Sequence, residues 1–172
     1  IYVNGSNTSI YYAKVNGDGS ISNWNTTNLL PAANNASTAV IYNGYLYIMG
    51  GAGPANTIYY AKINSDGTVG SWQTNLTPIT GLRLSTSIAY NGYLYVIGGD
   101  PNDATLATTT VQIMKFNGDG SLGNYATSSN SLLTTRAGQS SFVANGYVYV
   151  IGGRDSNSTI LSSIEFAKLN NN

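Results

Sequence analysis

The side chains of this chain best suited to recognition chemistry are a few charged groups in segments that differ from repeat to repeat. They are Arg83, Asp100, Asp103, Arg136, Arg154 and Asp155. Arginine presents a planar fork of donors that matches carboxylates, and aspartate accepts hydrogen bonds from hydroxyls and amides. We predict that these six residues form a ligand-binding site. A second interpretation stays open, in which the arginines only tie neighbouring loops together.

Few residues of this sequence are of types that usually perform catalysis. The chain contains no histidine and no cysteine, which removes the usual general base, thiolate nucleophiles and imidazole or thiolate metal ligands. Glycoside hydrolysis requires two facing carboxylates, and Glu165 is the only glutamate. We therefore predict no catalytic residues and no enzymatic activity.

Three turn-like segments of the form Asp-Gly-(Ser/Thr) raise the question of calcium. Their aspartates are Asp18, Asp66 and Asp119, one carboxylate for each turn. A calcium ion takes roughly 6–8 oxygen ligands, usually with several carboxylates. A simple turn is the better interpretation. The segment Asp100–Asp103, with two carboxylates in one loop, is a slightly better cation candidate than these turns. We predict no metal site and no cofactor.

Composition limits the class of partner. The chain has 172 residues with 7 basic and 7 acidic side chains, so its formal net charge is zero. Nucleic-acid binding would need a basic surplus, and we predict none. No apolar run approaches the roughly 20 residues of a membrane-spanning helix, so no membrane span is predicted. Only 8% of residues are charged, which is typical of an extracellular or cell-surface protein and favours that location.

Three nearly identical strings of residues occur along the chain. They are "NGYLYIMGG" at 43–51, "NGYLYVIGG" at 91–99 and "NGYVYVIGG" at 145–153. Other landmarks recur with these strings, among them "YYAKVN" at 11–16 and "YYAKIN" at 59–64. Such self-similarity at a period of about 50 residues is the signature of a repeat architecture.

Each repeat predicts four short strands and no helix. The strands are exemplified by "STSIAY", "YLYVIGG", "YYAKIN" and "TVGSW", which we call a, b, c and d. An Asn-Gly pair between a and b favours a tight type I′ hairpin. The Gly- and Asp-rich turn between c and d predicts a second hairpin. No segment has the 3.6-residue apolar period of a helix.

These landmarks together resemble the kelch repeat. The resemblance rests on the Gly-Gly that closes strand b, on Trp24 and Trp72, and on an arginine before strand a at Arg83 and Arg136. Tyr125 stands where the third tryptophan is expected, and Asn34-Asn35 stand where the first copy would carry arginine. The resemblance implies a β-propeller, in which the arginine position often contacts partners from the loop-rich face.

The predicted fold is all-β, a kelch-like propeller segment of about three and a half four-stranded antiparallel blades with essentially no helix. It forms one domain over 1–172, divided into a partial blade at 1–24, blades at 25–72 and 73–125, and a partial blade at 126–172. The strand count is three, four, four and three. Because propellers close into rings, we expect further blades from the same longer chain or from other subunits.

The variable loops predict where function lies. An up-and-down order of strands puts all a–b and c–d turns on one rim and all b–c and d–a connections on the other. The second rim differs in every copy, which predicts a non-enzymatic binding or display module that engages a protein or a glycan there. Two alternatives stay open: a structural domain of an extracellular filament, sheath or stalk, and part of a carbohydrate-active enzyme.

Overall fold

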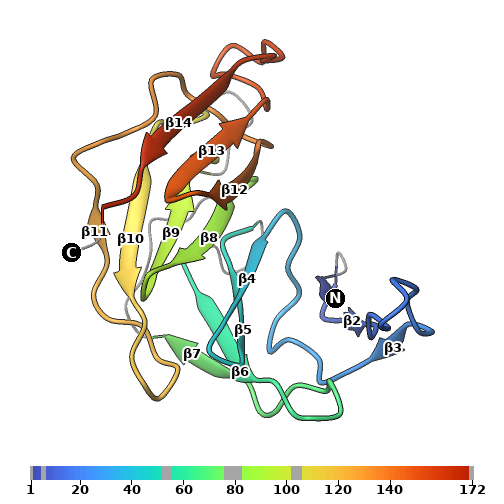
Figure 1. Cartoon of the computed structure of the whole chain (residues 1–172). Coiled ribbons are helices and arrows are strands. Elements are labelled where there is room, and N and C mark those ends of the chain that lie inside the picture. The colour runs from blue at the N-terminus through green and yellow to red at the C-terminus, as the bar shows by residue number, and fades with distance from the viewer. Residues whose placement is uncertain (1, 5–6, 52–55, 76–82, 102–105, 171–172) are drawn as a thin grey trace.

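The computed structural model describes residues 2–4, 7–51, 56–75, 83–101 and 106–170 of the chain (Figure 1). These residues form four separate antiparallel sheets and contain no helix. The sheets follow one another in chain order, and we number them blades 1 to 4. The predicted count of three, four, four and three strands is confirmed.

Every blade is an up-and-down meander of strands. Blade 1 contains β1 (Tyr2–Asn4), β2 (Ile10–Tyr12) and β3 (Asn25–Thr26). Blade 2 contains β4 (Thr38–Tyr42), β5 (Tyr45–Met49), β6 (Ile58–Lys62) and β7 (Gln73–Asn75). Blade 3 contains β8 (Thr86–Tyr90), β9 (Tyr93–Ile97), β10 (Val111–Lys115) and β11 (Ala126–Thr127). Blade 4 contains β12 (Ser140–Ala144), β13 (Tyr147–Ile151) and β14 (Ile164–Lys168).

The predicted Asn-Gly hairpins are confirmed. Asn91 and Gly92 join β8 to β9 with φ angles of 47° and 83°, and the other two Asn-Gly pairs have the same left-handed backbone. Both central residues of a type I′ turn need positive φ, which asparagine tolerates and glycine adopts freely. The turn fixes the register, so Tyr90 lies opposite Tyr93 and Thr86 lies opposite Ile97.

The first strands of blades 2, 3 and 4 lie beside one another and connect the blades (Figure 1). The Thr38 hydroxyl lies 2.8 Å from the Ser87 hydroxyl, and the Thr86 hydroxyl lies 2.7 Å from that of Ser141. A second link uses only backbone. Leu84 N donates to the Ala36 carbonyl at 2.9 Å, and Gly138 N donates to the Leu84 carbonyl at 2.8 Å. These three residues have φ of 54°, 54° and 70°.

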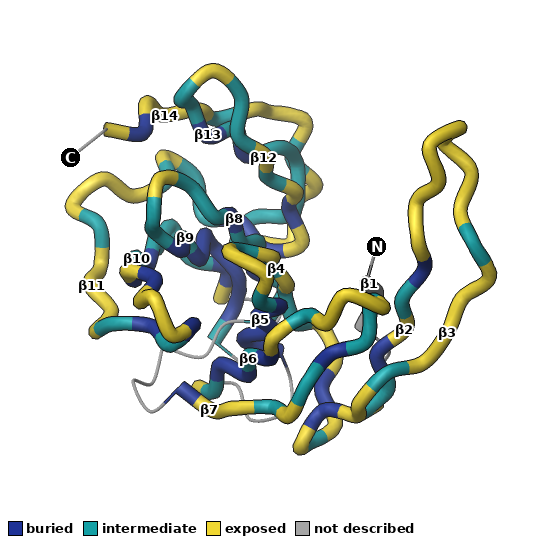
Figure 2. The backbone as a smooth tube through the Cα atoms, turned by 60° about the horizontal axis from the view of Figure 1, so that its bottom comes forward, coloured by how far each residue is buried: buried dark blue, intermediate teal, exposed yellow. Residues whose placement is uncertain are grey.

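Three apolar clusters lie between consecutive blades. Tyr47 and Met49 of blade 2 meet Leu94, Met114 and other residues of blade 3, and all four of these side chains are buried. Similar clusters join blade 1 to blade 2 and blade 3 to blade 4. Burial is greatest on β5, β6 and β9, whereas β3 and β11 are exposed (Figure 2). The blade faces therefore form the core, because each sheet buries its apolar surface against its neighbour.

The outer strand of blades 1, 2 and 3, which corresponds to strand d, lies later in the sequence than predicted. The residues before the aromatic position form only single bridges, such as Ile63 with Val69 and Phe116 with Leu122. The outer strands β3, β7 and β11 follow that position. At the bridge the apolar residue of the turn points into the preceding blade, so strand pairing is interrupted there. We call the segments 15–21, 63–69 and 116–122 the DG hairpins.

The outer strands also lie beyond the predicted divisions after residues 24, 72 and 125. β3, for example, begins at Asn25 and pairs with β2 of the first sheet. As limits of domains, those divisions stay a prediction.

Candidate binding site at the loop rim

The b–c and d–a connections meet on one rim, where backbone bridges join them. In blade 3, Arg83 N donates to the Asp100 carbonyl and Asp100 N donates to the Arg83 carbonyl, both at 2.8 Å. In blade 4, Ala137 and Arg154 exchange the same pair of hydrogen bonds at 3.0 and 2.9 Å. Each bridge directly follows the Gly-Gly pair that ends strand b. These bridges fix the side chains of Arg83, Asp100 and Arg154 on a rigid frame.

The close approach of these connections depends on Gly99. Its φ is 97°, a conformation that L side chains rarely adopt. A Cβ atom there would lie 2.7 Å from the Arg83 carbonyl oxygen and 2.9 Å from the Ser85 Cβ. At this position the Gly-Gly pair lets neighbouring backbones approach closely.

Asp100 is the centre of the rim cluster. Its side chain is fully buried, and its carboxylate accepts a hydrogen bond from Arg83 Nε at 2.8 Å and one from Arg154 Nη2 at 3.4 Å. Arg154 belongs to blade 4, so the carboxylate connects two blades. The arginine side chains stay 26% and 23% exposed. Two guanidinium groups around one buried carboxylate therefore present a positively charged surface to the rim.

Arg136 has a different role, because its side chain is fully buried. Nε and Nη2 donate to Glu165 Oε1 at 3.1 and 2.9 Å, Nη1 donates to the carbonyls of Gly152 and Ser163, and Nη2 donates to the Ser163 hydroxyl. All five guanidinium N–H groups are thus used within the chain. Arg136 fastens the loop before β12 to β14 and to the end of β13.

Glu165 completes this arrangement from β14. Its carboxylate also accepts the backbone N–H groups of Leu133 at 2.6 Å and Thr134 at 3.0 Å. Burial alone would raise the pKa of Glu165, but the hydrogen bonds from Leu133, Arg136 and Thr134 and the charge of Arg136 hold its pKa below the usual 4.5. The carboxylate is therefore charged at neutral pH and acts as an acceptor within the fold.

Arg83 and Arg136 do not occupy equivalent positions, contrary to the alignment by which both precede strand a. The bridge that Arg83 makes with Asp100 corresponds to the bridge of Ala137 with Arg154. Arg136 is thus one position earlier in its repeat than Arg83. This offset explains why one guanidinium faces the rim while the other is buried.

The remaining predicted site residues lie apart from the cluster or outside the described residues. Asp155 Oδ1 accepts the backbone N–H groups of Asn157 and Thr159, both at 2.8 Å, and so shapes its own loop. Asp103 lies outside the described residues. The structure thus brings together Arg83, Asp100 and Arg154 of the six predicted residues.

Two polar groups that the sequence did not point to lie buried near the same connections. Thr108 Oγ1 and Gln139 Oε1 have no hydrogen-bond partner among the described residues. Thr108 pairs through its backbone with Arg136, and Gln139 Nε2 donates to the Ile97 carbonyl at 2.8 Å. Buried polar atoms without partners are uncommon. No motif marks either residue, so only the three-dimensional arrangement reveals them.

The Asp-Gly turns behave as turns. Asp18, Asp66 and Asp119 each accept the backbone N–H and the hydroxyl of the residue two positions later. Within the described part of the chain, no three acidic, histidine or cysteine side chains group together as metal ligands would. Over the same part, no helix is long and apolar enough to cross a membrane.

Four consecutive antiparallel sheets, packed face to face with the first strands of blades 2, 3 and 4 side by side, define a β-propeller. The solved structure of YjhT has this fold, with a TM-score of 0.77 and 15% identity over 97% of this chain. Residues 135–165 match the family model of the Kelch motif. The chain thus has a β-propeller fold and carries a match to the Kelch motif in its fourth blade.

The chain spans 58% of the length of the YjhT chain, so likeness to YjhT concerns the fold of the shared part. A search of the curated proteins finds no match.

Proposed function

We propose that the chain is a non-enzymatic binding module that holds an acidic segment of a partner protein at its loop rim. The observation that carries the proposal is the pair of partly exposed guanidinium groups that the buried Asp100 carboxylate fixes between two blades. A fixed guanidinium loses little side-chain entropy on binding and matches the geometry of a carboxylate. Arg83 and Arg154 are the contact residues, and Asp100 positions them.

The proposed location is extracellular or at the cell surface, in keeping with the small share of charged residues. Protease accessibility on intact cells that produce the full protein tests the location. Loss of the protein from the cell surface fraction under mild protease treatment is the expected result, and full protection would contradict it.

The binding test uses an array of short synthetic peptides. Peptides that carry Asp or Glu in an extended segment are compared with Lys-containing peptides of the same length, and neutral and carboxylated oligosaccharides form a second set. We expect saturable binding of acidic peptides. The double variant Arg83→Gln and Arg154→Gln should weaken that binding at least about tenfold, which corresponds to roughly 1.4 kcal/mol.

A matched control removes the same charge elsewhere. Lys62 and Lys115 are exposed at the ends of β6 and β10, opposite the tyrosines that begin β5 and β9 at the other rim. Lys62→Gln with Lys115→Gln should leave acidic-peptide binding unchanged. Equal losses in both double variants would mean non-specific attraction and would contradict the site. Binding of oligosaccharides alone would favour a glycan ligand, and ordered filaments without any ligand binding would favour the structural alternative.

A further inference from the structure

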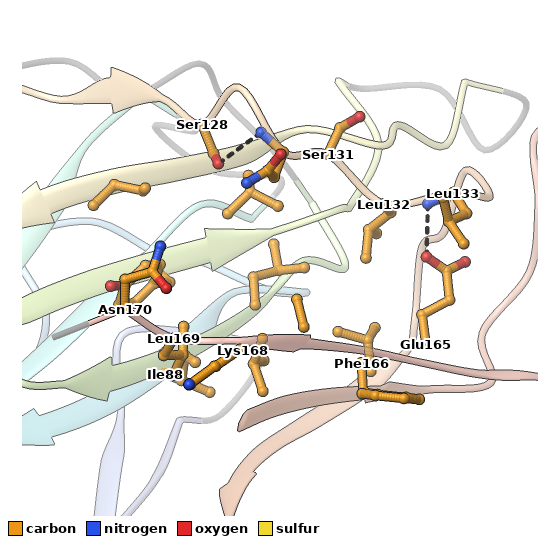
Figure 3. A pocket seen from close by; sticks show the side chains of 18 of the residues that line it. Ile88, Ser128, Ser131, Leu132, Leu133, Glu165, Phe166, Lys168, Leu169 and Asn170 are labelled. Carbon is orange, nitrogen blue, oxygen red and sulfur yellow. Dashed lines mark hydrogen bonds between the residues drawn. The ribbon is translucent and has the colours of Figure 1, made fainter. Parts of the chain in front are cut away.

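A cavity of about 760 Å³ lies between blades 3 and 4 (Figure 3). Its lining does not include Arg83, Asp100 or Arg154 of the rim cluster. Tyr95 and Val111 of blade 3 line one wall, and Val148, Val150 and Ala167 of blade 4 line the other. The segment 128–133 forms its edge. The two other blade interfaces show what fills the corresponding space.

Between blades 2 and 3, this space is filled by a DG hairpin. Tyr47 and Ile58 occupy the positions in blade 2 that Tyr95 and Val111 occupy in blade 3, as the strand registers show. Leu122 of the DG hairpin is only 4% exposed and packs in the same cluster as both of them. The Tyr47 hydroxyl donates to the Gly120 carbonyl at 2.8 Å.

Between blades 1 and 2, the DG hairpin is held at both its apolar side chain and its backbone. Val69 is 2% exposed in the cluster with Ile10. Its N–H donates to Thr27 Oγ1 at 2.8 Å, and its carbonyl accepts from Asn28 Nδ2 at 2.9 Å. Trp72 Nε1 donates to the Asn28 carbonyl at 3.1 Å. One apolar side chain and a short polar pair on the preceding blade therefore secure the hairpin.

The interface between blades 3 and 4 carries a similar polar pair. Ser128 N donates to the Val111 carbonyl at 2.8 Å, as Thr27 N donates to the Ile10 carbonyl at 3.1 Å, so Ser128 corresponds to Thr27. Leu132 N donates to the Thr109 carbonyl at 2.9 Å, as Leu30 N donates to the Thr8 carbonyl at 2.8 Å. Asn130, two positions before Leu132, therefore corresponds to Asn28, with one additional residue after Ser128. Both Ser128 and Asn130 line the cavity. In this structure the Ser128 hydroxyl accepts the Asn130 N–H at 3.1 Å (Figure 3). The edge thus offers an acceptor and an amide donor beside an apolar wall.

We propose that this cavity binds an extended peptide strand of a partner polypeptide whose sequence has the pattern Gly-(Ser/Thr)-aliphatic. The aliphatic side chain fills the space between Val111 and Val150. The backbone of that residue donates to the Ser128 hydroxyl and accepts from the Asn130 amide, and the glycine carbonyl accepts from the Tyr95 hydroxyl. The strand that follows pairs with β14, as β11 pairs with β10.

The glycine in the pattern has a steric reason. A Cβ atom on Gly120 would lie 2.5 Å from Tyr45 Cε1, and one on Gly67 would lie 2.9 Å from Tyr12 Cε2. Tyr93 corresponds to Tyr45 and lines the cavity. A larger residue at this place would meet its ring. The cavity therefore selects glycine two positions before the aliphatic residue.

The test uses the whole chain and a synthetic peptide with its own residues 117–128, Asn-Gly-Asp-Gly-Ser-Leu-Gly-Asn-Tyr-Ala-Thr-Ser. We expect saturable one-to-one binding in a fluorescence titration. Hydrogen exchange should slow at the amides of 164–168. A peptide with Leu122→Asp and one with Gly120→Val should each bind at least about tenfold more weakly, since one charges the buried side chain and the other meets the tyrosine.

Variants of the protein separate this site from the rim. Asn130 is exposed, so Asn130→Ala should leave the melting temperature of the chain unchanged while it weakens peptide binding several-fold. Arg83→Gln alone keeps the contact of Arg154 with Asp100 between blades 3 and 4 and should leave peptide binding unchanged, so failure of the rim proposal does not affect this one. The proposal is overturned if no peptide binds, if the Leu122→Asp peptide binds equally well, or if protection falls outside 164–168. It is also overturned if a second copy of the chain protects these amides without peptide.

Discussion

Asn34 and Arg136 perform the same task in different blades. Asn34 Nδ2 donates to the Gly50 carbonyl at 2.7 Å, and Arg136 Nη1 donates to the Gly152 carbonyl at 2.8 Å. Each acceptor is the first glycine of the Gly-Gly pair in its own blade, and both donors are buried. A short amide thus serves where the first repeat lacks arginine, and the longer guanidinium additionally reaches β14.

Replacing Arg136 by alanine should strongly destabilise the chain. The change leaves the Glu165 carboxylate, which is only 11% exposed, without its ion-pair partner. Breaking a buried pair in this way costs about 3–5 kcal/mol of unfolding free energy. Urea denaturation followed by tyrosine and tryptophan fluorescence measures it. Arg136→Lys keeps the positive charge but not the planar guanidinium group, and it should lower the unfolding free energy by less than Arg136→Ala does. An unchanged midpoint for Arg136→Ala would contradict the structural role.

Glu165 should make stability depend on pH in the acid range. Its pKa in the folded chain lies below the usual 4.5, because hydrogen bonds from Leu133, Arg136 and Thr134 outweigh the effect of burial. A lowered pKa contributes stability that is present above the unfolded pKa and is lost as pH falls through the folded pKa. We expect the unfolding free energy to fall below about pH 4.5. Glu165→Gln should reduce this slope, and equal slopes in both proteins would refute the assignment.

Gly120→Ala should destabilise the interface of blades 2 and 3. Gly120 has φ of 87°, and an added Cβ would lie 2.5 Å from Tyr45 Cε1. Left-handed backbone at a residue with a side chain costs about 1–2 kcal/mol before the clash is counted. Gly118→Ala is the matched control, since no atom lies within 4 Å of its Cβ. Thermal melting compares the two, and equal melting temperatures would argue against the close approach.

Tyr47→Phe removes the hydrogen bond that crosses from blade 2 to Gly120. Burial raises the pKa of the Tyr47 hydroxyl, which stays a neutral donor to the Gly120 carbonyl. We expect a loss of about 1 kcal/mol in unfolding free energy. Tyr95→Phe changes the corresponding hydroxyl in blade 3, for which the described residues show no hydrogen bond, and should change stability by less than about 0.5 kcal/mol. Similar losses at both positions would show that the hydrogen bond is not the cause.

The outer face of blade 4 should drive self-association of the chain. Phe142 and Phe166 stack on Tyr149 and remain 47% and 67% exposed, although the corresponding blade 2 positions pack against blade 3. Exposed apolar patches promote association. Sedimentation velocity should show concentration-dependent oligomers that Phe142→Ser with Phe166→Ser reduces. Leu133→Ser is the control, because Leu133 is 91% exposed but lies in a loop. A monomer at all concentrations would contradict the predicted need for further blades.

Much of the fold could be predicted because its signals are local. Asn91-Gly92 marks a hairpin by backbone preference alone, and the Tyr- and Val-rich segment 93–97 marks the strand after it. The outer strands could not be placed in the same way. The sequence around Val69 predicts a strand, but Val69 forms only a single bridge, because its side chain packs into an apolar site on the preceding blade. That site is formed by residues far away in the sequence, including Ile10.

The sequence could indicate which residues form the candidate site, but not what each of these residues does. Charge and loop position single out Arg83 and Arg136 equally. Arg136 lies one residue earlier in its repeat than Arg83, relative to the backbone bridge that follows the Gly-Gly pair. This difference places the Arg83 side chain at the rim and buries that of Arg136. Glu165 was considered only as a catalytic group, because its partners Leu133 and Arg136 come from the loop before the blade. Thr108 and Gln139 have no sequence signal at all.

The backbone link that runs from Ala36 through Leu84 to Gly138 has a bearing on how such a chain evolves. Its hydrogen bonds use main-chain groups only, so the joint between blades does not depend on which side chains the loops carry. Alanine, leucine and glycine all occupy it. A gene segment that encodes one blade can thus be copied or lost by recombination and still join its neighbours. Loop sequences are free to diverge after each such event.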